Sequence, residues 1–150
     1  MKRAIILSLM VFMAIALRAQ SDLQVYPLFE GKIIPQERMV VTRIKGMMMQ
    51  KYRLSLFHSV VFDGTEEEAK RVSRLIEREE DIASSDYQSK KVKALMRQLP
   101  AKKGKNRFLC FKSRNKSKGC HVVVIYMEGP LASLNELEKL LSSVSEGDLE

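Results

Sequence analysis

The sequence predicts an α+β domain, a mainly antiparallel sheet with two helices packed on one face. Three observations lead to this prediction. Segments with the two-residue alternation of half-buried strands outnumber the helical segments. Most of these strands follow one another directly, as in hairpins, rather than through helical crossovers. Finally, each of the two helical segments begins with a capping box.

The first predicted hairpin joins strands at 39–46 and 52–63. The first strand reads MVVTRIKG, is rich in β-branched and apolar residues, and ends at Gly46. One face of the second strand consists of alternate residues, namely Tyr52, Leu54, Leu56, His58, Val60 and Phe62. Within the preceding stretch, 20–38, residues 23–31 fit either a short strand broken by Pro27 or one helical turn, and Pro35 marks a loop before the first strand.

The first helix is predicted to begin at Thr65, because Thr65 and Glu68 form a capping box and acidic residues favour a helix N-terminus. Its buried stripe consists of apolar residues at helical spacing, namely Ala69, Val72, Leu75 and Ile76. We expect this helix to fade within 82–85, where Ser-Ser-Asp begins.

The segment 90–100 fits both a strand and a helix, and we favour a strand because 107–111 follows as a hairpin partner. The apolar run at 120–127 is the clearest strand of the chain. A second capping box, Ser133 with Glu136, predicts a final helix over 133–143. The polar residues 145–150 are expected to form a frayed tail.

The N-terminus has the pattern of a secretory signal peptide. Lys2 and Arg3 precede an uncharged, largely apolar run of 14 residues, and Ala19 offers a small residue for cleavage. This run is shorter than the ~20 residues that a transmembrane helix needs. We therefore expect residues 1–19 to be removed and residues 20–150 to form a single exported domain. No later segment predicts a transmembrane span, and the leader lacks the cysteine of a lipoprotein signal.

Two cysteines, Cys110 and Cys120, flank a basic loop. In an oxidising compartment they are expected to form a disulfide if the turn centres near Asn115. The alternative is a pair of buried free thiols. Sequence alone cannot decide between them, because a disulfide needs a specific separation of the two residues.

Catalytic and metal sites have weak support. Redox enzymes use Cys-x-x-Cys at a helix start, whereas these cysteines lie on strands. Cys120 and His121 are neighbours in a strand and point to opposite faces. His58 lies in an apolar pattern typical of a core histidine, and no set of residues has the spacing of a zinc site. Met47–Met49 could supply soft copper ligands, but flexible apolar filling is the simpler interpretation. No cofactor is expected.

The charge distribution is the most informative feature. The full chain has a net charge of +8, and the segment 90–118 holds 12 basic residues and no acidic one. A basic pole of this kind attracts polyanions. The candidate anion-binding residues are Arg97, Lys102, Lys103, Lys105, Arg107, Lys112, Arg114, Lys116 and Lys118. The alternative is a pair of solvated loops whose lysines prevent edge-to-edge aggregation.

Three stretches carry a family resemblance: LFEGK near the start of the mature chain, LPAKKGKNRFLCF, and VIYMEGPLASLNELEKLL. Its most specific residues are Asn106–Phe108 and Tyr126–Gly129. The sequence resembles a domain-of-unknown-function family of small exported proteins typical of Bacteroidota. This resemblance implies a periplasmic or cell-surface location in a Gram-negative bacterium, and it implies no activity.

Together these features predict a non-enzymatic binding or interaction protein of the cell envelope. Its expected partner is an anionic envelope component, such as lipid phosphate, lipopolysaccharide or an acidic glycan, or an acidic protein. Nucleic acid is disfavoured by the predicted location. The alternative is a periplasmic enzyme whose site is assembled from scattered polar residues.

Overall fold

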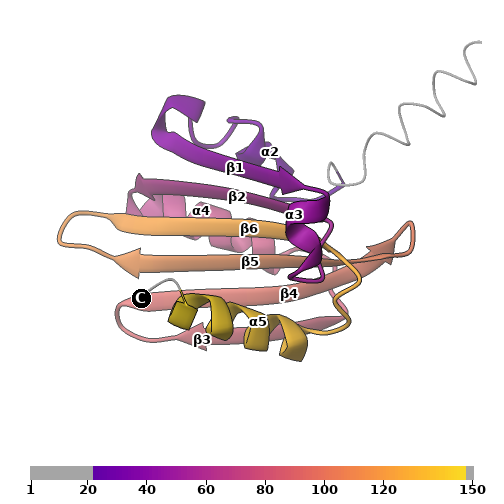
Figure 1. The fold of residues 1–150 in the computed structure, drawn as a ribbon. Helices are drawn as coiled ribbons and strands as arrows, with labels where there is room; N and C mark the ends of the chain where they lie inside the picture. Colours follow the sequence, from indigo (N-terminus) through magenta and orange to yellow (C-terminus); the bar gives the residue numbers. More distant parts are fainter. Residues whose placement is uncertain (1–21, 148–150) are drawn as a thin grey trace, which may run out of the picture.

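The computed structural model describes residues 22–147, apart from the side chains of residues 48, 49 and 143–147. The predicted signal peptide lies outside the described residues. In the described part, one sheet forms the centre of the molecule (Figure 1). Its strands are β1 (Met39–Lys45), β2 (Leu56–Gly64), β3 (Ala83–Gln88), β4 (Val92–Lys102), β5 (Lys105–Asn115) and β6 (Cys120–Gly129).

The six strands lie in the order β1-β2-β6-β5-β4-β3, and every neighbouring pair is antiparallel. β3 to β6 follow one another as a meander. The β1–β2 hairpin joins this meander through β2 and β6, where Leu56 lies opposite Glu128 and Gly64 opposite Cys120. The prediction of a mainly antiparallel α+β sheet is therefore confirmed.

The remaining elements are short helices in the N-terminal half and two longer ones. They are α2 (Tyr26–Phe29), η1 (Gln36–Arg38), α3 (Met47–Gln50), α4 (Glu66–Glu77) and α5 (Leu134–Gly147). α4 begins with the predicted capping box, in which the Glu68 backbone N–H donates to the Thr65 hydroxyl at 3.1 Å. α5 includes residues 145–147, which the sequence analysis assigns to the tail.

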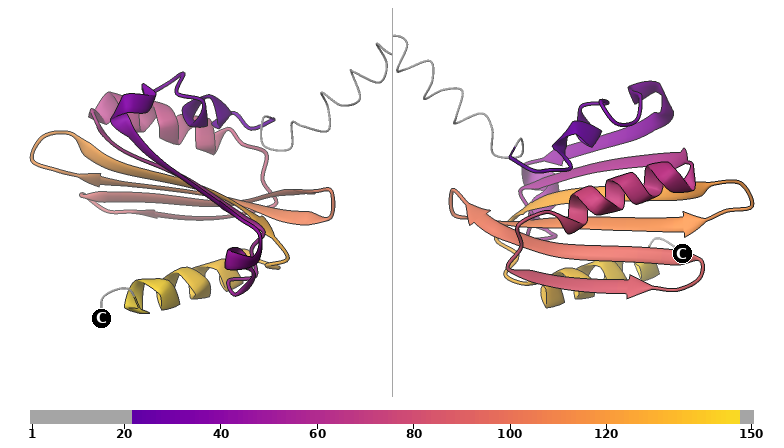
Figure 2. Two further views of the ribbon diagram at one scale, coloured as in Figure 1. Left: turned by 45° about the horizontal axis from the view of Figure 1, so that its top comes forward. Right: turned by 180° about the vertical axis from the view of Figure 1, so that it is seen from behind.

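The prediction that both helices pack on one face is wrong. Figure 2 shows α4 and α5 on opposite faces of the sheet. The reason is that some strands bury side chains on both faces of the sheet. On β5, Leu109 and Phe111 pack in the cluster that contains α4, whereas Phe108 and Cys110 pack in the cluster that contains α5. A sheet with two apolar faces needs cover on both sides.

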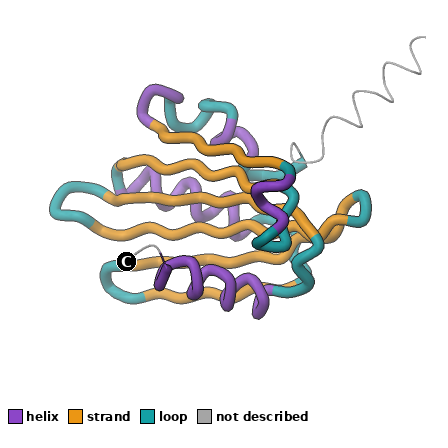
Figure 3. Tube along the Cα trace, in the orientation of Figure 1, coloured by secondary structure: helices purple, strands orange, loops and turns teal. Residues whose placement is uncertain are grey.

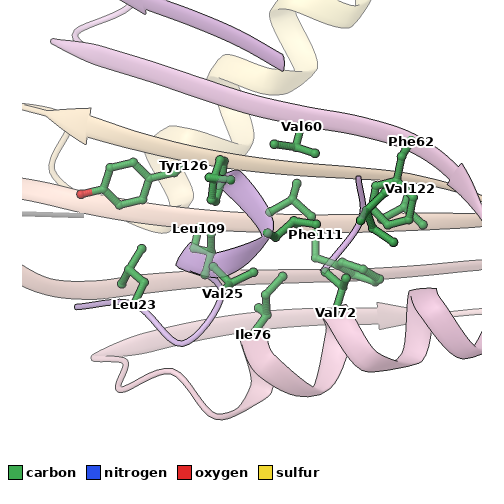
Figure 4. Close-up of a cluster of buried hydrophobic side chains, with 14 of the residues drawn as sticks. Leu23, Val25, Val60, Phe62, Val72, Ile76, Leu109, Phe111, Val122 and Tyr126 are labelled. Atoms are coloured by element: carbon green, nitrogen blue, oxygen red, sulfur yellow. The ribbon is translucent and has the colours of Figure 1, made fainter. Parts of the chain in front are cut away.

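The larger core lies between the sheet and α4 (Figure 4). Val72 and Ile76 of α4 are fully buried against the sheet residues Val60, Phe111 and others. α4 is only 12 residues long, so it leaves part of this face open. The segment 22–34 covers the remainder with the buried side chains of Leu23, Val25, Leu28, Phe29 and Ile34.

β3 was not predicted from the sequence. Its six residues, ASSDYQ, are almost all exposed, because β3 is an edge strand with little apolar pattern. The segment 90–100, which fits both a strand and a helix in sequence, forms most of β4. The loops that connect the strands gather at the two ends of the sheet (Figure 3).

Candidate functional site

The nine candidate anion-binding residues do not form one basic pole. Lys102, Lys103 and Lys105 lie at the turn between β4 and β5, whereas Lys116 and Lys118 lie in the loop between β5 and β6. These two connections lie at opposite ends of the sheet (Figure 1). β5 is 11 residues long, which separates them by roughly 30 Å at the usual rise per strand residue. The prediction of a single pole is therefore corrected.

Two of the nine residues have structural roles. Arg97 is only 6% exposed and forms ion pairs with Asp81, at 3.4 Å, and with Asp86. Arg107 is 4% exposed, and its guanidinium pairs with Asp22 at 3.2 Å and donates to the Pro100 carbonyl at 3.1 Å. A buried cation requires such partners, because desolvation of an unpaired charge is costly. Both arginines bind the chain's own oxygens, so we remove them from the candidate anion site.

We call the end of the sheet that holds the β3–β4 turn and the β5–β6 loop the basic end. Its cationic residues are Lys90, Lys91, Lys112, Arg114, Lys116 and Lys118. Asn115 holds the two connections together: its backbone N–H donates to the Lys91 carbonyl at 2.8 Å and its side-chain amide to the Lys90 carbonyl at 3.2 Å. Lys116 pairs with Asp63 at 2.9 Å. Among the side chains that the structure describes, no ion pair engages Lys112, Arg114 or Lys118.

A cavity of about 230 Å³ opens between α4 and the β3–β4 turn at the basic end. We call it the lysine cavity. Its buried lining includes Phe111, Ser113 and Cys120. Its other lining residues are Glu66, Ala69, Lys70, Ser73, Gln88, Ser89, Lys90, Lys91, Val92, Lys93 and Asn115. Four lysines and one glutamate give this lining a net positive charge, which suits an anionic group.

The local folding explains how these lysines come together. Lys70 and Ser73 are three residues apart on α4 and therefore share one helix surface. Lys93 lies opposite Ser113 in the β4–β5 ladder. The Lys93 ammonium pairs with Glu77 of α4 at 2.8 Å and donates a hydrogen bond to the Ser73 hydroxyl at 3.4 Å. These two contacts join the start of β4 to α4. Among the described residues, Lys70, Lys90 and Lys91 have no ion-pair partner.

The Cys120 thiol in this cavity is not an activated nucleophile. Burial raises its pKa, the Glu66 carboxylate raises it further, and Lys70 only partly opposes these effects. Burial also raises the pKa of the Cys110 thiol, to about 12. A thiol in this state is protonated at neutral pH, whereas catalytic cysteines react as thiolates.

The predicted disulfide is absent, and both cysteines are free thiols. Cys110 lies opposite Ile125 and Cys120 lies opposite Asn115, so they are far apart along the ladder. They also belong to the cores on opposite faces of the sheet. The prediction required a turn centred near Asn115. The turn instead follows Asn115, where the Lys116 N–H donates to the Gly119 carbonyl at 2.9 Å.

The two histidines lie in different environments. His58 is 9% exposed, and its ring centroid lies 4.5 Å from that of Phe29, which fits the predicted core histidine. Burial, with a smaller effect of Arg43, lowers its pKa. The exposed His121 contacts Asp63 at 2.7 Å, and His121 and Lys116 lower the pKa of Asp63. Among the described side chains, no three His, Cys, Asp or Glu residues lie close enough together to hold a metal ion.

Sequence reasoning missed two parts of the lysine cavity. In the sequence, Lys70 lies on the polar side of an amphipathic helix, where nothing distinguishes it from other exposed lysines. Lys90, Lys91 and Lys93 counted toward the basic segment, but they could not be placed without β3. The structure pairs residues 83–88 with residues 93–98. A sequence prediction of this pairing would have placed Lys90 and Lys91 in a turn and so would have indicated the site.

Within the described part of the chain, no helix is long and apolar enough to cross a membrane. Comparison with curated proteins finds no match. A family model does match, over residues 12–141, and its description is a family of unknown function, DUF6108. Because the match includes the whole sheet, α4 and the lysine cavity, we conclude that the chain belongs to the DUF6108 family.

Proposed function

We propose that this protein is a non-enzymatic, exported binding protein of the cell envelope that engages an anionic component through its basic end. The lysine cavity carries this proposal. Three of its lysines, Lys70, Lys90 and Lys91, have no ion-pair partner among the described residues. Their charges are therefore available to a ligand without first breaking a salt bridge.

The partner is expected to present phosphate or carboxylate groups, as lipid phosphates, lipopolysaccharide and acidic glycans do. An ammonium group binds such groups as a point charge without a fixed geometry. The cavity can hold one of them, while the exposed Lys118 in the β5–β6 loop lies at the same end of the sheet for a neighbouring charge. Attraction of this kind acts over a Debye length of about 8 Å at physiological salt.

The catalytic alternative has less support. The thiol at the cavity is protonated by its environment, because the burial of Cys120 raises its pKa. The histidine nearest to Cys120 in the chain, His121, points to the other face of the sheet and pairs with Asp63. A nucleophile with its base is therefore not assembled at this cavity.

The test is a charge reversal with a matched control at the other end of the sheet. Lys90→Glu with Lys91→Glu removes two cavity lysines, and Lys103→Glu with Lys105→Glu makes the same charge change at the β4–β5 turn. Each basic residue near an anionic surface contributes about 1 kcal/mol. The first variant should therefore bind anionic vesicles or lipopolysaccharide at least thirtyfold more weakly, with a smaller salt dependence. The control should bind nearly as well as the parent.

Equal weakening in both variants would show that total charge, and not the basic end, determines binding. Unchanged binding in both, or no binding by the parent, would reject the proposal and leave the basic loops as solvated turns. The melting temperatures of the variants should lie close to that of the parent, because all four lysines are exposed.

Export is tested separately. The intact mass of the protein recovered from the cell envelope should correspond to a chain that begins at Gln20. Retention of residues 1–19 in a membrane fraction would contradict the export part of the proposal.

A further inference from the structure

A second concave site lies on the other face of the sheet, away from the lysine cavity. It is a groove of about 170 Å³ that we call the apolar groove. Its lining consists of Ile44, Tyr52, Leu54, Phe57, Met127, Leu140 and Leu141. All are apolar except for the hydroxyl of Tyr52, so the groove offers almost no hydrogen-bonding group to a ligand.

The walls of the groove come from three fixed parts of the fold. Ile44, Phe57 and Met127 belong to β1, β2 and β6. Leu54 lies in the segment that links α3 to β2. Backbone hydrogen bonds hold this segment in place, from the Leu131 N–H to the Arg53 carbonyl at 3.2 Å and from the Ser55 N–H to the Glu128 carbonyl at 2.7 Å.

α5 supplies the third wall. Its first apolar residues, Leu134 and Leu137, are buried and fix the helix on the sheet. Leu140 and Leu141, about one turn later, remain only partly buried. Apolar side chains that neither pack fully nor point into solvent can still bury surface against a ligand.

A positive charge lies at the rim. The Lys51 ammonium is 4.7 Å from the centre of the Tyr52 ring, and Tyr52 lines the groove. Among the side chains that the structure describes, no acidic residue lines the groove. Nearby Glu136 has its own partner, Arg53, at 3.4 Å.

From this arrangement we propose that the apolar groove binds the hydrocarbon chain of a fatty acid, with its carboxylate at Lys51. The volume favours a single chain, because drug-sized ligands need pockets of roughly 300 Å³ or more. The apolar lining matches an alkyl chain, and the rim charge matches its anionic head. This site is on the opposite face from the lysine cavity, and it does not depend on the proposed function.

The experiment is a chain-length series. Straight-chain carboxylates of increasing length are titrated into the protein by calorimetry, below their micelle concentrations. Each buried methylene should strengthen binding about fourfold until the groove is full, after which the affinity should level off. The matching alkanols should bind more weakly. Lys51→Gln should reduce the affinity of each carboxylate toward that of its alkanol, because only the head-group contact is removed.

Leu140→Trp tests the position by filling the groove, and Ile82→Trp is its matched control. Ile82 is 63% exposed and does not line the groove, so the control adds the same ring elsewhere. Leu140→Trp should abolish the dependence on chain length, whereas Ile82→Trp should keep it. Circular dichroism melting checks that both variants fold.

Three outcomes would overturn the proposal. The first is that the parent binds no carboxylate of any chain length, and the second is that Leu140→Trp binds the series as the parent does. In the third case, sedimentation would reveal a dimer of the parent that Leu140→Trp dissociates, which would make the groove an interface between two copies. The Lys90→Glu, Lys91→Glu variant should bind the carboxylates normally, so failure of this proposal is distinguishable from failure of the proposed function.

Discussion

Glu68 joins the start of α4 to the chain before β1 through one carboxylate. It accepts the Thr65 backbone N–H at 3.0 Å within the capping box. It also receives two hydrogen bonds of 2.9 Å from the guanidinium of Arg38, which lies 30 residues earlier. Arg38, with a smaller contribution from the Thr65 N–H, lowers the pKa of Glu68 from 4.5 to about 2. A single surface residue thus fixes the start of α4 against the chain before β1.

This contact predicts a pH-dependent stability. Because folding lowers the pKa of Glu68, the stabilisation is complete above the ordinary pKa of 4.5 and is lost as the pH falls toward 2. Glu68→Gln should lower the free energy of unfolding by about 1 kcal/mol at pH 7, because the ion pair with Arg38 is partly exposed and screened by solvent. Near pH 2 the difference should almost vanish. Glu67→Gln, one residue earlier in the same helical turn, should cost less at pH 7. Urea unfolding at both pH values measures this, and an equal loss at both would contradict it.

The cysteines also differ at the scale of single residues. Cys120 lines the lysine cavity, whereas Cys110 is enclosed in the core beside α5. An alkylating reagent should therefore modify Cys120 well before Cys110, and both reactions should be slow, since burial raises both pKa values. Mass spectrometry of the folded protein at several times gives the order. Cys120→Ser should remove the faster reaction. If alkylation increases the mass only after reduction, the two cysteines form a disulfide, as the sequence predicted.

The β5–β6 turn shows how one element depends on close backbone contact. Gly119 has a φ of +79°, and a Cβ atom there would lie 2.3 Å from the Gly64 carbonyl oxygen at the end of β2. Gly104, in the β4–β5 turn, has a similar φ of +74° but no atom within 4 Å of such a Cβ. The β5–β6 turn therefore packs on β2, whereas the β4–β5 turn projects into solvent.

This pair of glycines gives a controlled prediction. Gly104→Ala should cost about 1 kcal/mol, the usual penalty of a left-handed conformation for an L residue. Gly119→Ala carries this penalty and a clash with backbone, so it should cost about 1–3 kcal/mol more. Denaturant unfolding of both variants gives the two values. Equal costs would mean that the turn moves away from β2 without loss.

How far the sequence predicts these elements depends on the kind of signal. β2 and β6 were predictable because their apolar residues repeat in a strand pattern, and α4 because Thr65 and Glu68 fix its start. β3 was not predictable, because an exposed edge strand needs no apolar face. The side on which α5 packs was not predictable either, since Phe108 and Cys110 look like ordinary members of an apolar run. The disulfide prediction failed because turn position, which sequence fixes poorly, decides which residues are opposite.

At the scale of the whole molecule, the segment before β1 acts as a cover for the sheet. Leu23, Val25, Leu28 and Phe29 are each at least 93% buried. Two polar contacts hold its start. The buried Glu79 carboxylate accepts the Val25 N–H at 2.9 Å, and Asp22 pairs with Arg107. Such a segment belongs to the core, although its only regular elements are the short helices α2 and η1.

Removal of residues 1–30 should therefore unfold much of the protein. Burial of one large apolar side chain contributes about 1.5–3 kcal/mol, and four of them together approach the entire stability of a typical domain. Removal of residues 1–21 alone, which leaves Asp22 and all four apolar residues in place, should preserve the melting transition. Circular dichroism melting compares the two. A cooperative transition in the shorter chain would show that the sheet retains its core without this cover.

The β2–β6 pairing has a consequence for how the chain folds as it emerges. β3, β4 and β5 each pair with the strand that follows them in the chain, so each of these ladders closes a short loop. β2 cannot form its ladder with β6 until β6 is present, because Leu56 pairs with Glu128, 72 residues later. Pairs so far apart in sequence form slowly, because the chain between them must first be ordered. A chain delivered N-terminus first therefore exposes the apolar β1–β2 hairpin until nearly the whole domain has arrived. Slow release of the chain, or a chaperone that holds the exposed hairpin, should therefore raise the yield of native protein most during this interval.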